Sequence, residues 1–243
     1  MELIVLGSEG GWATPGGAAC GYLLHHEGFN VWLDAGTGTM ANLQEHIGLR
    51  DVDAVVVSHR HFDHFLDLYP YFLALRLDPE RQGRVRLFAP PGFFEHALQL
   101  ETKLGEVFEP VVVEPGATFE AGPIVVRTGS MTHPVPTLGM RFEVDGRALA
   151  YSADTGPCDE LVRLGRQSDV LLCEATWLER PEGWEVIHLT AAEAGEYAAR
   201  AGAGRLILTH SWPTNDLERA AGQAGAEFGG PVDVASPGMS VNP

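Results

Sequence analysis

The heptapeptide SHRHFDH, residues 58–64, places three histidines and an aspartate within six consecutive positions. His59 and His61 stand two residues apart, so in an extended turn both imidazoles can point the same way and bind one ion. Asp63 and His64 turn away from that pair and can serve a neighbouring ion. Imidazole together with carboxylate favours zinc, with manganese or iron as alternatives. The segment therefore predicts a centre for two divalent metal ions, which needs further ligands from elsewhere in the chain.

Three more candidate ligands lie far along the chain. They are His133 in SMTHPVP, Asp154 in YSADTG and His210 in ILTHSWP. An aspartate can bridge two cations through its two oxygens, and two metals about 3.5–4 Å apart can share a hydroxide whose pKa lies near neutrality. That hydroxide is the expected nucleophile.

The rest of the chain supplies elements that can position these residues. Short apolar runs typical of β-strands recur as ELIVLG, GYLLHH, NVWLDAG, DAVVVSH, RVRLFAP, PIVVRTG, RALAYSAD, DVLLCEA and RLILTHS. Helical patterns lie between several of them: GTMANLQEHIG, FLDLYPYFLALRL, PGFFEHALQLETKLG, LTAAEAGEYAARAG and DLERAAGQAGAEF. This alternation predicts sheets covered by helices.

The reactive residues fall where these strand-like runs end. This holds for His59, His133, Asp154, Glu174 and His210. Ligand sites in α/β sheets collect at the carboxyl ends of strands. We therefore expect these side chains to converge on one site.

In order and spacing, these residues resemble the metallo-β-lactamase superfamily over nearly the whole chain. The HxHxDH signature spans residues 59–64, and VWLDAG, with Asp34, is similar to the family's strand-ending acidic residue. The resemblance implies an α/β (α+β) fold, an αββα sandwich of two mixed sheets with helices on both outer faces. It also implies the ligand sets: His59, His61 and His133 on one ion, Asp63, His64 and His210 on the other, and Asp154 as the bridge.

Length and composition predict one globular domain, residues 1–243, because 45% of the residues are hydrophobic and 20% are charged, and the resemblance implies that it is a hydrolase domain. The net charge of -17 opposes binding of long polyanionic partners, although a metal centre adds positive charge locally.

The N-terminal segment MELIVLGSEGG has no basic region, and no 18 apolar residues run together. We therefore expect neither a signal peptide nor a membrane partner, and a cytoplasmic location. Three scattered cysteines without a CxxC pair fit a reducing compartment.

The stretch IHLTAAEAGEYAARAGAGRLILTHSWP resembles the ribonuclease Z and cyclic-phosphodiesterase branch, in which an HxT motif precedes a helix and the last metal histidine. His188 and Thr190 match that motif. Thr190 and Glu193 form a capping-box pattern, so a phosphate oxygen could bind at the helix start, with His188 donating a proton to the leaving oxygen. The resemblance implies that Glu174 orients His188. Each of the three also has a purely structural interpretation, as a surface histidine, a helix cap and a strand-end glutamate.

The glycine-rich segment GSEGGWATPGGAACGY, residues 7–22, is a second candidate for substrate contact. Gly11 could let the backbone approach a ligand, and Trp12 could stack on a base, although such loops also occur without a ligand. The segment lacks basic residues, and nothing between Asp154 and His188 is long or basic enough to be the arm that clamps tRNA in tRNA 3′-processing enzymes. Both features favour a smaller phosphodiester.

The sequence thus predicts a dinuclear metal-dependent phosphodiesterase that cleaves a small nucleotide-like or cyclic phosphodiester. A metal-bridging hydroxide would attack phosphorus, Asp63 would orient it and accept its proton, and His188 would assist the leaving group. The main alternative is an acyl hydrolase acting on a thioester, lactone or β-lactam. A tRNA 3′-processing endoribonuclease and a non-catalytic metal-binding module are further alternatives. Relatives in the phosphodiesterase branch are often dimers, so FLDLYPYFLALRL could form a homodimer interface or belong to the core.

Overall fold

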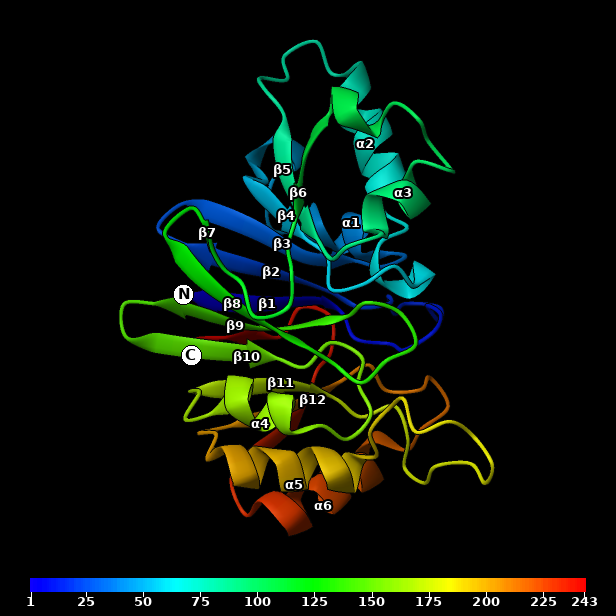
Figure 1. Ribbon diagram of the computed structural model, residues 1–243, viewed down its shortest axis with the longest axis vertical. Coiled ribbons are helices and arrows are strands. Elements are labelled where there is room, and N and C mark those ends of the chain that lie inside the picture. The colour runs from blue at the N-terminus through cyan, green and yellow to red at the C-terminus, as the bar shows by residue number, and fades with distance from the viewer.

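The computed structural model describes the whole chain, residues 1–243, as two seven-stranded sheets packed face to face with helices on both outer sides (Figure 1). Apolar side chains from both sheets meet between them in one buried cluster, which includes Leu24, Leu33, Phe142 and Leu172. The predicted αββα sandwich is therefore confirmed.

The first sheet has the order β14-β1-β2-β3-β4-β5-β6, antiparallel from β14 to β3 and parallel from β3 to β6. In that order its strands are Ser240–Val241, Glu2–Gly7, Gly21–His26, Phe29–Ala35, Ala54–Val56, Val85–Ala89 and Phe108–Val112. Three helices cover its outer face (Figure 1): α1 (Thr39–Leu43), α2 (Leu68–Leu77) and α3 (Phe93–Ala97). Short 3-10 turns lie at Leu49–Asp51, Phe62–His64 and Leu104–Glu106.

The second sheet has the order β13-β12-β11-β10-β9-β8-β7, parallel from β13 to β10 and antiparallel from β10 to β7. In that order its strands are Val232–Val234, Leu206–Thr209, Val170–Glu174, Arg147–Tyr151, Leu138–Val144, Ile124–Ser130 and Thr118–Ala121. Its outer face is covered by α4 (Asp159–Gly165), α5 (Ala191–Ala201) and α6 (Leu217–Phe228) (Figure 1).

Strand β3 shows why the strands could be recognised as apolar runs. Val31 and Leu33 point into the cluster between the sheets, whereas Trp32 points toward the helices and packs edge to face on Tyr71, with 5.4 Å between ring centroids. Successive side chains of a strand alternate between its two faces, so a strand covered on both faces is apolar throughout. All nine predicted strands are present.

The helices were predicted less well. The patterns GTMANLQEHIG and PGFFEHALQLETKLG form only the short helices α1 and α3, and the helix α4 was not predicted. After α3 ends at Ala97, Leu98 and Leu100 are exposed, so a longer helix has no apolar surface to pack against. The helix α2 begins at Leu68, which puts Pro70 in the first turn, where its missing N–H is tolerated. No helix combines the length and apolar character that a membrane crossing requires.

Candidate metal centre

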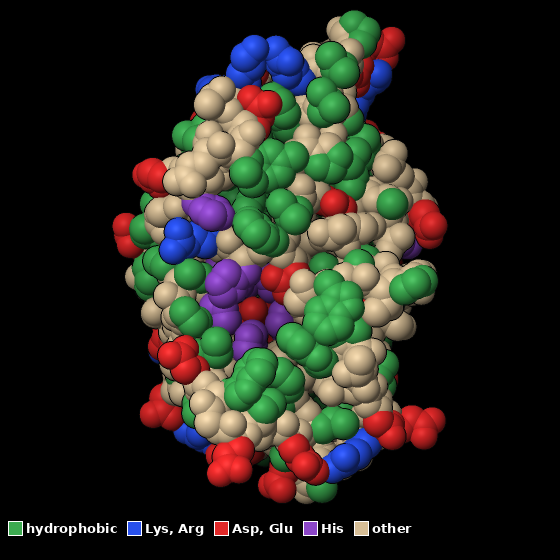
Figure 2. Space-filling view, turned by 90° about the vertical axis from the view of Figure 1, so that its right-hand side faces the viewer, with side chains coloured by type: hydrophobic (Ala, Val, Ile, Leu, Met, Phe, Trp, Pro, Cys, Tyr) green, Lys and Arg blue, Asp and Glu red, His purple; other side chains and the backbone are tan.

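The seven predicted ligand residues lie together at one edge of the sandwich, where strands of both sheets end. The first sheet contributes the segment after β4, which turns through residues 62–64, and the second contributes the segments after β8, β10 and β12. Figure 2 shows histidine side chains gathered around acidic ones in a hollow, bordered by large hydrophobic side chains. The predicted convergence at strand ends is found in the structure.

A first set of ligand atoms surrounds one oxygen of Asp154. Asp154 Oδ2 lies 3.5 Å from His59 Nε2 and 3.7 Å from His133 Nε2. His133 Nε2 in turn lies 3.0 Å from His61 Nδ1. One ligand atom from each of the four residues lies within 4.8 Å of the other three, close enough to surround a single ion.

A second set surrounds the other oxygen of the same carboxylate. Asp154 Oδ1 lies 3.2 Å from His64 Nε2 and 3.3 Å from His210 Nε2. Asp63 Oδ2 lies 3.2 Å from His210 Nε2 and 3.7 Å from His64 Nε2. The carboxylate of Asp154 therefore presents one oxygen to each set, which is the arrangement a bridging ligand needs.

Each of four histidines is held through the ring nitrogen that faces away from the centre. Histidines that bind metals usually donate their second N–H to a carboxylate, a carbonyl or another polar group, which fixes the ring. The pairs are His59 Nδ1 with Ser58 Oγ (3.0 Å), His64 Nδ1 with Asp34 Oδ2 (2.8 Å), His133 Nδ1 with the Ile187 carbonyl (3.1 Å), and His210 Nδ1 with Thr176 Oγ1 (2.8 Å).

Asp34 connects several of these contacts. Its buried carboxylate accepts hydrogen bonds from the backbone N–H and hydroxyl of Ser58, from His64 Nδ1 and from the Tyr151 hydroxyl, all at 2.7–2.8 Å. Asp34, Ala153 and His210 have φ near +50°, a strained region for residues with side chains. Strain of this kind persists where the surroundings enforce it, often at functional sites. The sequence indicated Asp34 only as a strand-ending acid, and gave no signal for Ser58.

The ligand atoms fit divalent cations because several have no partner within the protein. His59 Nε2, His64 Nε2 and Asp154 Oδ1 are buried and accept or donate no hydrogen bond. A buried polar atom without a partner costs about 1–3 kcal/mol. Burial lowers the pKa of His59 to about 3 and that of His133 to about 4, so both rings are neutral, the form that binds metals. Nitrogen and carboxylate donors suit zinc, manganese or iron.

The carboxylates and one histidine offset each other's charge. Burial alone would raise the pKa of Asp154, but His210, His64 and His59 outweigh it and hold that pKa well below its usual range. Burial would lower the pKa of His64, but Asp154, Asp63 and Asp34 outweigh it and hold that pKa well above its usual range. A cation that binds here takes the place of the proton on His64.

His188 lies beside the ligand sets, with its ring stacked on that of His210 at 5.4 Å between centroids. The buried carboxylate of Glu174 accepts a hydrogen bond from His188 Nδ1 at 2.9 Å. Burial would lower the pKa of His188, but Glu174 outweighs it and raises that pKa to about 9. Glu174 also accepts from the hydroxyl of Thr176 at 2.7 Å, so one carboxylate fixes the surroundings of two histidines. The sequence gave no signal for Thr176.

Thr190 is the N-cap of α5, as the capping-box pattern predicted. Its hydroxyl oxygen accepts from the backbone N–H of Glu193 at 3.2 Å and lies 3.0 Å from Glu193 Oε2, while that carboxylate accepts from the Thr190 N–H at 2.7 Å. The hydroxyl is used within the cap, which favours the purely structural interpretation of Thr190.

The glycine-rich loop touches the centre directly. The N–H of Gly11 donates to Asp63 Oδ2 at 2.7 Å. A Cβ at Gly10 would come within 2.8 Å of the His210 ring, so only glycine lets the loop approach this closely. Trp12, which is 45% exposed, packs edge to face on Trp212 at 4.8 Å between centroids.

Trp12 is the outer member of a row of tryptophans that the sequence did not predict. From Trp212 the row continues to Trp177 at 5.0 Å and from there to the exposed Trp184 at 5.5 Å between centroids. The rings come from three parts of the chain, and two of them adjoin the centre in sequence: Trp212 is two residues after His210, and Trp12 follows Gly11, whose N–H donates to Asp63. No spacing in the sequence could have revealed their contacts.

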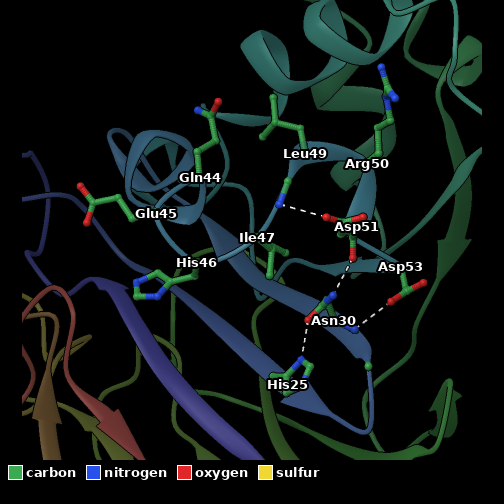
Figure 3. Close-up of a pocket in the computed structure, with 12 residues that line it drawn as sticks. His25, Asn30, Gln44, Glu45, His46, Ile47, Leu49, Arg50, Asp51 and Asp53 are labelled. Carbon is green, nitrogen blue, oxygen red and sulfur yellow. Dashed lines mark hydrogen bonds between the residues drawn. The ribbon is translucent and has the colours of Figure 1, made fainter.

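A separate hollow of about 710 Å³ lies between β2, β3 and the segment after α1 (Figure 3). It also carries histidines and acids, among them His25, His46, Asp51 and Asp53. Asn30 joins three of its neighbours: its Oδ1 lies 2.8 Å from His25 Nδ1, its N–H donates to Asp53 Oδ2 and its Nδ2 donates to the Asp51 carbonyl, both at 2.8 Å. None of the predicted site residues lies here.

Comparisons with known proteins agree with this geometry. A family model described as a beta-lactamase superfamily domain matches residues 29–211. The Mycobacterium tuberculosis protein Rv1339 is 35% identical over 96% of this chain and 88% of its own length. A ribonuclease Z of Thermobifida fusca is 30% identical over 99% of this chain and 94% of its own. The crystal structure of the metallo-beta-lactamase fold protein YhfI from Bacillus subtilis superposes with a TM-score of 0.91, at 25% identity, over 99% of this chain and 98% of that one.

Proposed function

The chain belongs to the metallo-β-lactamase superfamily as one of its metallo-hydrolases, and from that premise we propose that it is a dinuclear phosphodiesterase acting on small nucleotide-like or cyclic phosphodiesters. The observation that carries the proposal is the Glu174–His188 pair, in which a buried carboxylate holds an imidazole beside the two ligand sets. We treat residues 1–243 as one hydrolase domain, because side chains of both sheets share a buried cluster.

The two sets of ligand atoms define how the ions would be held. The proposed holders are His59, His61 and His133 for one ion, Asp63, His64 and His210 for the other, and Asp154 for both. Zinc is the first candidate, with manganese or iron as alternatives. When bound, two such cations activate a water at neutral pH and neutralise charge on a phosphodiester.

Asp63 has the position to orient the attacking water and accept its proton. Its Oδ2 is fixed by the Gly11 N–H at 2.7 Å and lies 3.2 Å from His210 Nε2. These contacts leave Oδ1 for the water. The backbone of the glycine-rich loop thereby sets the direction of the carboxylate.

His188 has the position and the charge to protonate the leaving oxygen. Its Nδ1 is engaged by Glu174, so Nε2 is the nitrogen available to a substrate. Glu174 raises the pKa of His188 to about 9, which favours the protonated ring that a general acid needs. An acyl hydrolase has no comparable need for this group.

The net charge, the lack of a basic arm and an exposed aromatic ring favour a small substrate. The net charge of -17 and the lack of a basic arm oppose a long nucleic acid. Trp12 follows Gly11, whose N–H donates to Asp63, and its exposed ring could stack on a base attached to the phosphodiester.

The test compares substrates on one enzyme preparation. Protein stripped with a chelator and refilled with Zn²⁺ or Mn²⁺ is assayed with bis(p-nitrophenyl) phosphate, a thioester and a β-lactam under identical conditions. We expect preference for the diester, and a loss of about 10²–10⁴-fold in kcat in His188→Ala at unchanged metal content. The matched control is His46→Ala, an exposed histidine of the separate hollow, which should behave as wild type. Turnover of the thioester or lactam alone would replace the proposal with acyl hydrolysis.

A further inference from the structure

A small pocket of about 280 Å³ adjoins the metal centre on the side of the first ligand set. Its lining residues are Arg60, His61, Phe62, His96 and Val135. His61 belongs to both places, because its Nδ1 lies 3.0 Å from His133 Nε2 in the first ligand set. Figure 2 shows a basic side chain and a further histidine beside the histidine hollow. A group bound in this pocket would therefore lie next to a ligand of the first ion.

Arg60 carries a positive charge that no other side chain neutralises. Most arginines of this acidic chain pair with a carboxylate, as Arg76 does with Glu106 at 2.7 Å, and others donate to backbone carbonyls. The side chain of Arg60 forms neither kind of contact, and Arg166 is the one other arginine of which this is true. A guanidinium beside bound cations is repelled by them unless an anion lies between. The position of Arg60 therefore suits an anionic ligand.

His96 adds a second polar group without a partner. Neither of its ring nitrogens forms a hydrogen bond within the chain, and its Nε2 is buried. Outside the two ligand sets, no other histidine has a buried nitrogen of this kind. The ring is held by Phe62, stacked on it at 6.1 Å, and by Phe65, edge to face at 5.9 Å between centroids. An unpartnered polar atom in a fixed ring indicates a partner from outside the chain.

The remaining walls of the pocket are apolar and carry no negative charge. They are formed by Val135 and by Phe62, whose side chain is 56% exposed. No aspartate or glutamate lines the pocket, although the chain contains 33 of them and the hollow around Asn30 is lined by several. Apolar walls exclude water, which strengthens the attraction between a guanidinium and an anion. The pocket thus combines a free cation, a polar ring and no acidic neighbour.

We propose that this pocket binds a second phosphate group of the substrate, with Arg60 and His96 as its hydrogen-bond donors. The planar guanidinium of arginine donates two parallel N–H groups to a phosphate, and an imidazole N–H adds a third donor. The substrate class is then a nucleotide-like diester that carries a further phosphate close to the one that is cleaved. The inference rests on the proposed function for the reaction, but binding of the second phosphate requires no turnover.

The first experiment measures binding alone. Calorimetric titration of zinc-loaded protein compares thymidine 3′,5′-bisphosphate with thymidine 5′-phosphate. Both offer one phosphate to the metal centre, and they differ only in the second phosphate. Wild-type protein should bind the bisphosphate about tenfold more tightly or better, as expected for hydrogen bonds between charged groups. Equal affinities for the two nucleotides would overturn the proposal.

Variants assign that difference in affinity to the pocket. Arg60→Ala should remove most of it, and His96→Phe, which keeps the ring packing, should reduce it. The matched control is Arg166→Ala, which changes the net charge equally and should keep the difference. Arg166 lies between α4 and β11, at the sheet edge away from the carboxyl ends of the strands. Zinc content checks that each variant is loaded, and a difference that survives in Arg60→Ala, or is lost in Arg166→Ala, would contradict the assignment.

The second experiment measures turnover of two diesters with the same scissile bond, thymidine 5′-(p-nitrophenyl phosphate) with and without a 3′-phosphate. Wild-type kcat/KM should be about tenfold higher or more for the phosphorylated diester, and this ratio should fall toward one in Arg60→Ala. Cleavage of both diesters at equal kcat/KM, with equal binding of the two nucleotides, would remove the subsite and keep the phosphodiesterase. Tighter binding of the bisphosphate without cleavage of either diester would keep the subsite and remove the proposed function.

Discussion

The metal centre and the hollow around Asn30 contain the same residue types (Figures 2 and 3). They differ in whether the polar atoms of these residues have hydrogen-bond partners within the protein. In the hollow, His25, Asp51 and Asp53 are joined through Asn30 by hydrogen bonds of 2.8 Å. In the centre, polar atoms are buried, point toward one another and include several without a partner. Histidines and acids alone therefore do not define a site here. Unsatisfied, buried and converging ligand atoms do.

Asp154 is the residue whose loss should affect the centre most. Asp154→Ala removes the oxygens that face both sets, so we expect loss of both ions and a fall in diester hydrolysis of more than about 100-fold. The matched variant in the hollow, Asp53→Ala, should retain metal and activity. Metal content by mass spectrometry and kcat/KM check both variants. Two bound ions in Asp154→Ala would mean that metal binding depends on Asp154 no more than on Asp53 in the hollow.

Asp34 tests whether the outer hydrogen bonds support the ligands. Asp34→Asn places an amide N–H₂ among four donors, so His64 and Ser58 lose an acceptor. Zinc affinity should fall about 10–100-fold, the usual cost of losing such a partner. Calorimetric titration measures it, with unfolding of the metal-free protein as the control for folding. An unchanged zinc affinity would mean that the metal ligands keep their orientation without the hydrogen bonds to Asp34.

Trp12 tests whether the aromatic border of the centre binds substrate. Trp12→Ala should raise KM for an aromatic diester about tenfold, since one stacked base contributes about 1–3 kcal/mol. KM for dimethyl phosphate, which has no ring, should not change. Leu217→Ala, at another exposed apolar residue, is the control. Equal effects on both substrates would show that Trp12 supports the loop and does not stack.

Replacing Asn30 should have the smallest effect of these changes, and it should alter stability alone. Asn30→Ala leaves His25 Nδ1 without its partner, so the free energy of unfolding should fall by about 1–2 kcal/mol. Metal content and kcat should stay at wild-type values. Denaturant unfolding and a zinc titration measure the two properties. A loss of bound zinc in this variant would mean that the hollow also holds metal.

The parts predicted from sequence are those set by local pattern. Strands buried on both faces are apolar throughout, and the residue after a strand lies at the sheet edge, so nine strands and the convergence of His59, His133, Asp154 and His210 could be foreseen. Helices α1 and α3 were overestimated, because apolar spacing alone does not show whether there is a surface to pack against.

The parts not predicted depend on contacts between distant segments. Ser58 and Tyr151 act through Asp34, and Thr176 acts through His210, across pairs of residues far apart in sequence.

The most direct test of the central claim is a calorimetric titration of chelator-stripped protein with Zn²⁺, read beside the metal content of the refilled protein. Converging ligand sets that share Asp154 predict two zinc ions per chain, and fewer than two in Asp154→Ala. One ion or none in wild type, or two in Asp154→Ala, would contradict a two-metal centre bridged by Asp154.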